Sequence, residues 1–118
     1  MNGIFFDIDT ESTTLVASDA HKLVCYTRHD IKSEIKSSFI LPKKPSSVLK
    51  NILGKGDEDV IVRFDNRNAC FEFESFTLVC RLVEGNYPAY KSVIPKNNTN
   101  KLVINRLDFL NSSRRVAV

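Results

Sequence analysis

Three residue types that can do chemistry together lie close in the stretch "SDAHKLVCY", from Ser18 to Tyr26. Cys25 with His21 and Asp19 offers a thiol, an imidazole and a carboxylate, the types found in a nucleophile with its base and orienting group. In one strand, offsets of two and four residues put all three on one face. A shared face is not a site, because catalytic partners usually come from different elements and a strand cysteine is more often an apolar packing residue. A Cys/His-dependent hydrolase is therefore kept only as an alternative hypothesis.

Composition and cysteine usage narrow the class of protein. The chain has 118 residues, of which 42% are hydrophobic and 26% charged, as in an ordinary globular domain. Its start has no signal-peptide pattern and no segment is long and apolar enough to span a membrane, so we expect a cytoplasmic protein. The cysteines Cys25, Cys70 and Cys80 are odd in number and have no metal-ligand spacing. We expect reduced thiols on strands, no metal and no cofactor.

Hydrophobic periodicity predicts a strand-rich domain with two helices. Alternation predicts strands at 4–9, 60–65 and 70–74, and β-rich apolar runs predict further strands at 15–17, 23–28, 39–41, 77–83 and 102–104. A helix is predicted over 45–54, with Val48, Leu49, Ile52 and Leu53 on one face. A second helix should follow Asn105 as its N-cap. The sequence therefore predicts an α+β fold.

The order of these elements is repetitive. Three strands are followed by a strand and a helix, then by three strands and another strand and helix, with the two strand-helix units about sixty residues apart. This order predicts duplication of a βαβββ unit. The chain starts and stops out of phase with that unit, which suggests a piece of something longer. The last strand and helix could fill the vacant first place, within one chain or by a swap between two chains.

Charge is distributed unevenly along the chain, although the net charge is only +3. Both predicted helices carry basic residues, and no acidic residue falls between Lys43 and Gly56. Basic helices attract phosphate groups through salt-sensitive electrostatics that do not read bases. The plainer interpretation is that these side chains form the solvated faces of the helices.

Five segments together resemble a known family. The order and spacing of "NGIFFDID", "LVASDAHKL", "FILPKKPSSVLKNIL", "LVEGNYPAYKSVIPKN" and "LVINRLDFLNSSRRVAV" resemble the bacterial DNA polymerase III beta subunit, the replicative sliding clamp. The resemblance implies a DNA clamp fold, with duplicated βαβββ units, basic helices on one side and antiparallel sheets on the other. It also implies that residues 1–97 form most of the middle domain, and that 98–118 form the first strand and helix of the third.

The function implied by this resemblance is mechanical. A homodimeric ring encircles duplex DNA without sequence preference and tethers DNA polymerase for processive synthesis, with no catalysis of its own, in the bacterial cytoplasm with the nucleoid. The residues implied to face DNA are Lys43, Lys44, Lys50, Arg114 and Arg115. The single chain is expected to be a monomer or a swapped dimer, because the rest of the ring-forming domains lies outside this sequence.

The resemblance also implies a hydrophobic pocket for short linear motifs of polymerases, the clamp loader and repair proteins. Its residues here would be Ser18, Ala20, His21, Lys22, Leu23, Pro88 and Val93. The chain departs from the common pattern at Ala20, where a glycine is usual, at Lys22, where an arginine is usual, and at Ser92, where some relatives have a basic residue. Since the apolar floor is kept, we expect peptide binding with altered affinity.

A stand-alone module for single-stranded nucleic acid is the other alternative. Such modules interleave aromatic with basic residues on an exposed sheet. Here the phenylalanines alternate with acids in "NACFEFES" and "NGIFFDID", which would repel phosphate and indicates core-facing rings. A salt-dependent titration with single-stranded DNA distinguishes this hypothesis.

Overall fold

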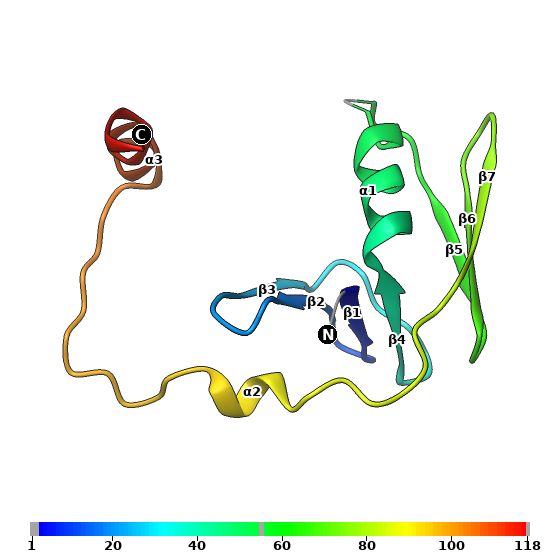
Figure 1. Ribbon diagram of the computed structural model, residues 1–118, viewed down its shortest axis with the longest axis horizontal. Coiled ribbons are helices and arrows are strands. Elements are labelled where there is room, and N and C mark those ends of the chain that lie inside the picture. The colour runs from blue at the N-terminus through cyan, green and yellow to red at the C-terminus, as the bar shows by residue number, and fades with distance from the viewer. Residues whose placement is uncertain (1–2, 55, 118) are drawn as a thin grey trace.

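The computed structural model describes residues 3–54 and 56–117, which form two antiparallel sheets and three helices (Figure 1). Sheet A has the strand order β3-β2-β1-β4 and sheet B the order β5-β6-β7. The strands are β1 (Gly3–Ile8), β2 (Thr13–Ser18), β3 (Leu23–Arg28), β4 (Ser37–Pro42), β5 (Ile61–Phe64), β6 (Asn68–Glu72) and β7 (Thr77–Arg81), and the helices are α1 (Lys43–Ile52), α2 (Tyr90–Val93) and α3 (Arg106–Val116).

The core lies where one face of sheet A, α1 and sheet B meet. Alternation in β1 and β4 puts Phe6 opposite Phe39 in register, and their rings stack with centroids 4.5 Å apart. Leu49 reaches this cluster from α1 and Phe71 from β6, and both are buried. The prediction of core-facing phenylalanines on the acid-alternating strands is therefore confirmed for Phe6 and Phe71, whereas Phe5 faces the other side of sheet A, against Tyr87.

The apolar face of α1 is narrower than predicted. Leu49 is buried and Ile52 half-buried, but Val48 and Leu53 are exposed. At about 100° per residue the four positions spread over about 140° of arc, and only the middle of that arc meets the sheets. The four residues thus share one side of the helix, as predicted, but only Leu49 and Ile52 are removed from solvent.

The opposite face of sheet A is covered by the segment that follows β7. This segment runs beneath the sheet in Figure 1 and includes the single turn α2, which the periodicity did not predict. Val16 and Tyr90 are buried between the segment and the sheet. The segment thus gives sheet A a second packed face.

α3 begins as predicted but packs on nothing. The side-chain oxygen of Asn105 accepts hydrogen bonds from Leu107 N at 3.0 Å and Asp108 N at 3.2 Å. None of the described residues of α3 is buried, and the helix lies apart from both sheets (Figure 1). The strand predicted at 102–104 is wrong: in the described part of the chain it finds no pairing partner, and a strand needs one for its backbone groups.

Candidate functional site

The turn between β2 and β3 forms one wall of the candidate site. Asp19 Oδ1 accepts hydrogen bonds from Lys22 N at 2.8 Å and His21 N at 3.1 Å, and Ser18 Oγ accepts one from Ala20 N at 3.3 Å. The backbone donors of Lys22 and His21 lower the pKa of Asp19 below its usual value. Ala20 has a φ of +73°, in the left-handed region. The backbone conformation that a glycine would favour is therefore kept, although the residue is alanine.

The second wall comes from the segment 86–95, far away in the sequence. Pro88 fixes its own φ just before α2, and Val93 ends that helix. Ser92 Oγ donates to Ala89 O at 2.6 Å, so this hydroxyl is used within the turn of α2. The wall is therefore built from a short helix and the proline before it.

Two adjoining hollows, of about 690 and 210 Å³, lie between these walls, and we call them together the hairpin pocket. They share Ser18, Ala20, Leu23 and Val93. The larger hollow also has His21, Lys22, Cys25, Ile94 and Pro95, and the smaller one also has Tyr87, Pro88, Ala89 and Tyr90. The structure thus brings all seven predicted pocket residues together around one site.

Six lining residues were not predicted: Cys25, Tyr87, Ala89, Tyr90, Ile94 and Pro95. Five of them are close in sequence to Pro88 or Val93, and this proximity was the available signal. Cys25 follows Leu23 by two residues in β3, so both side chains point to the same face. In the sequence, this alternation had indicated only a possible catalytic cluster of Asp19, His21 and Cys25.

Asp19 belongs to the β2–β3 turn, whereas His21 and Cys25 line the larger hollow of the hairpin pocket. Asp19 directs its oxygens to the backbone of the turn and to Lys22 Nζ, 3.3 Å away. Cys25 is exposed on β3, and Cys70 and Cys80 are free thiols on sheet B, as predicted. Among the residues that the structure describes, no three His, Cys, Asp or Glu side chains gather as metal ligands. Asp19 is therefore a turn-forming residue, not an orienting group for the imidazole.

The predicted DNA-facing residues are exposed but occupy two separate helices. Lys43, Lys44 and Lys50 lie on α1, and Lys43 and Lys50 border an apolar groove of about 550 Å³ between α1 and sheet A. Arg114 and Arg115 lie on α3, well away from α1 in Figure 1. The structure does not bring these five residues together on one surface.

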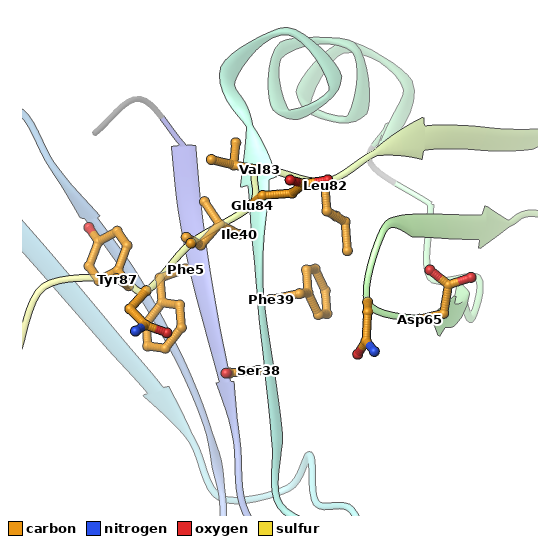
Figure 2. A pocket seen from close by; sticks show the side chains of 12 residues that line it. Phe5, Ser38, Phe39, Ile40, Asp65, Leu82, Val83, Glu84 and Tyr87 are labelled. Carbon is orange, nitrogen blue, oxygen red and sulfur yellow. The ribbon is translucent and has the colours of Figure 1, made fainter.

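A polar hollow of about 450 Å³ beside β4 is the main competing site (Figure 2). Its acidic residues are Asp65 and Glu84. Asp65 Oδ1 accepts hydrogen bonds from the backbone N of Arg67 and of Asn68, each at 2.7 Å, and Glu84 pairs with Arg81 at 3.4 Å. Since these carboxylates already have partners within the chain, the hairpin pocket is the better candidate.

Comparison with known proteins identifies the family. The model of the DNA polymerase III beta subunit, central domain, matches residues 1–89. This chain belongs to the DNA polymerase III beta subunit family. The "Beta sliding clamp" of Borreliella burgdorferi is 33% identical over 106 residues, which cover 88% of this chain and 27% of that protein. None of the described helices is both long and apolar enough to cross a membrane.

Solved beta subunits share the fold. The Thermotoga maritima subunit is 32% identical, with a TM-score of 0.82 over 98% of this chain and 31% of its own. The Bacillus subtilis sliding clamp, 24% identical, has a TM-score of 0.86 over 99% of this chain and 31% of its own. The fold is thus the predicted DNA clamp fold, with antiparallel sheets and basic helices. The chain spans about a quarter to a third of the length of the beta subunits that it matches.

Proposed function

We propose that this chain is part of a replicative sliding clamp, a non-catalytic ring that encircles duplex DNA and tethers DNA polymerase. The single observation that carries the proposal is the match of residues 1–89 to the central domain of the beta subunit. In this role the protein belongs in the bacterial cytoplasm with the nucleoid, and its full-length form is a homodimeric ring. Duplex DNA is its sequence-independent partner.

The proposed domain boundary falls near residue 97. Residues 1–97 then form most of the middle domain and 98–118 the start of the third. Two observations support this division: Asn97 has a φ of +59°, which marks a change of chain direction, and α3 has no buried residue within its described length. The alignment with the Bacillus subtilis clamp covers 99% of the chain, so the separate α3 is included in that similarity.

The hairpin pocket is proposed to bind short linear motifs of polymerases, the clamp loader and repair proteins. Leu23 and Val93 offer apolar contacts from opposite walls, and Pro88 presents a rigid apolar face. Lys22 lines the larger hollow with an exposed side chain whose ammonium pairs with Asp19, and its apolar stem is available to cover a bound side chain. This combination suits a peptide with leucine or phenylalanine anchors.

Titration with a peptide that carries Leu and Phe anchors, followed residue by residue in NMR spectra, tests the pocket. Two apolar anchors offset by the cost of association predict a dissociation constant of roughly 0.1 to 1 mM. Shifts confined to Ala20–Leu23 and Pro88–Val93 are the expected result. Absence of shifts at millimolar peptide would contradict the proposed site.

A matched pair of valines provides the control. Val93 and Val79 are 65% and 66% exposed, but only Val93 lines the hairpin pocket. Val93→Ser should weaken peptide binding severalfold because it removes apolar contact area, whereas Val79→Ser on sheet B should leave it unchanged. Equal weakening by both substitutions would indicate a general loss of structure.

A further inference from the structure

The two walls of the hairpin pocket are attached to the fold in different ways. The turn wall continues the β2–β3 ladder, in which Ser18 pairs with Leu23, and its loop is closed by Asp19. The segment wall belongs to no sheet. Its internal bonds join Ser92 to Ala89 and do not attach it to sheet A. The position of the segment wall therefore depends on side chains that reach the sheet.

Aromatic packing supplies part of that attachment. Tyr87 stacks on Phe5 of β1, with ring centroids 4.7 Å apart and planes within 3°, and the two rings lie against each other in Figure 2. Tyr90 meets the same Phe5 edge to face at 6.1 Å. Such contacts hold the segment against the sheet, but aromatic pairs are favourable over a range of offset and edge-to-face arrangements, with centroids about 4.5 to 7 Å apart, so they leave its position some freedom.

One directional contact removes this freedom. Tyr90 Oη donates a hydrogen bond of 2.9 Å to Asp7 Oδ2 on β1, a central strand of sheet A. Within residues 3–54 and 56–117 it is the one hydrogen bond of normal geometry that ties the segment 86–95 to the sheet. Burial and the bond to Asp7 raise the pKa of Tyr90 to about 12, so the hydroxyl stays a donor at neutral pH. Hydrogen bonds to a carboxylate are stronger than neutral ones.

The location of this bond connects it to the pocket. The ring of Tyr90 lines the smaller hollow, while its hydroxyl points to Asp7, which lines neither hollow. Pro88 and Val93 lie two residues before and three residues after Tyr90. Fixing Tyr90 therefore fixes both of the predicted peptide-contacting residues on this wall.

We propose that the Tyr90–Asp7 hydrogen bond sets the spacing between the two walls of the hairpin pocket, and that Asp7 is a positioning residue for peptide binding. The proposal rests on the proposed peptide-binding function. Asp7 acts through Tyr90 and has no contact with the bound peptide. Loss of the bond lets the segment wall shift on Phe5, so that Pro88 and Val93 no longer face Leu23 at the spacing an anchor residue needs.

The test compares three substitutions. Tyr90→Phe keeps the ring and removes only the hydroxyl, and should weaken the same Leu/Phe peptide about three- to tenfold. Asp7→Asn keeps an acceptor oxygen and should have a smaller effect. Tyr26→Phe is the control, because Tyr26 is exposed on β3 and lines neither hollow of the hairpin pocket. It should bind peptide as the parent chain does.

Two further measurements separate positioning from general stability. In the peptide-free protein, Tyr90→Phe should shift the methyl resonances of Val93 but not those of Leu23. Urea unfolding of each variant shows how much of any loss is stability alone.

The outcomes are distinct. Unchanged peptide affinity in Tyr90→Phe, or equal weakening by Tyr26→Phe, overturns the proposal. So does a Tyr90→Phe variant that is less stable but binds the peptide with the dissociation constant of the parent chain. If the parent chain does not bind the peptide, the proposed function fails. The methyl shifts of the peptide-free variants then still decide whether the bond positions the wall: a Val93 shift supports this, and its absence contradicts it.

Discussion

Ala20 shows how one residue can be strained to keep a turn. Its φ of +73° is in a region where the side chain of an L-residue crowds its own backbone. The hydrogen bonds of Ser18 and Asp19 to the turn backbone hold it there. The backbone N–H groups of Lys22 and His21 lower the pKa of Asp19, so their contribution to folding is present near neutral pH and is lost as the pH falls through that lowered pKa.

Replacing Ala20 with glycine should therefore stabilise the fold. Relief of the left-handed strain outweighs the extra freedom of glycine in the unfolded chain, and the free energy of unfolding should rise by about 0.5 to 1 kcal/mol. Urea unfolding followed by circular dichroism measures the change. Ala89→Gly is the control, since Ala89 also lines the hairpin pocket but has a φ of −65°. There the same substitution should lower stability, and a gain at both positions would contradict the argument from strain.

At the scale of elements, a narrow apolar contact holds α1 against the two sheets. Its polar side carries the exposed lysines, and its opposite side meets the core through Leu49. The helix follows β4 directly, so the chain direction of β4 decides where α1 starts. The same element therefore joins the core to the basic surface proposed to face DNA.

Truncating Leu49 should be far more costly than truncating its neighbour in sequence. Leu49→Ala removes a buried side chain between the two sheets and should lower the free energy of unfolding by about 2 to 4 kcal/mol. Val48→Ala, at a site that is 41% exposed, should cost less than about 1 kcal/mol. Denaturant unfolding of both variants measures this difference. Similar losses would mean that α1 packs with another face.

At the scale of the molecule, the separation of α1 and α3 limits what the chain can do by itself. The hypothesis that α3 returns to the vacant place within its own chain is wrong for this structure, because α3 lies apart from both sheets (Figure 1). A swap between two chains stays a prediction. The single chain presents two basic helices that do not share a surface, so strong DNA binding is not expected of it.

Weak binding of duplex DNA by this chain should depend on the lysines of α1. Lys43, Lys44 and Lys50 are expected to contact phosphates, so replacing all three with glutamine should reduce the slope of log affinity against log salt by about one to three for duplex DNA. Fluorescence anisotropy with labelled duplex at several salt concentrations measures it. The control replaces Lys32, Lys91 and Lys96, which removes the same charge elsewhere. An equal reduction in the control would show that net charge, not α1, attracts DNA.

Much of this protein was predictable from local sequence signals. Alternation predicted β1, β5 and β6, and β-rich apolar runs predicted β2, β3, β4 and β7. Asn105 marked the start of α3, and the order of the elements together with the quoted motifs indicated the clamp fold. These features depend on residues close together in the chain, where side-chain period and capping act directly. Even so, the exposure of Val48 and Leu53 on the apolar face of α1 was not predictable, because periodicity alone does not show how wide the contacting surface is.

Only the tertiary structure decided which distant residues meet. The run at 102–104 had the composition of a strand but finds no partner strand within the described residues. The short helix α2 is present, although hydrophobic periodicity did not predict it. The hydrogen bond between Asp7 and Tyr90 joins residues that are 83 positions apart in the sequence. Such contacts depend on how sheets and segments pack together, and no spacing along the chain encodes that packing. The pocket residues were therefore predicted through a family resemblance, while the folded chain brought them together from distant segments.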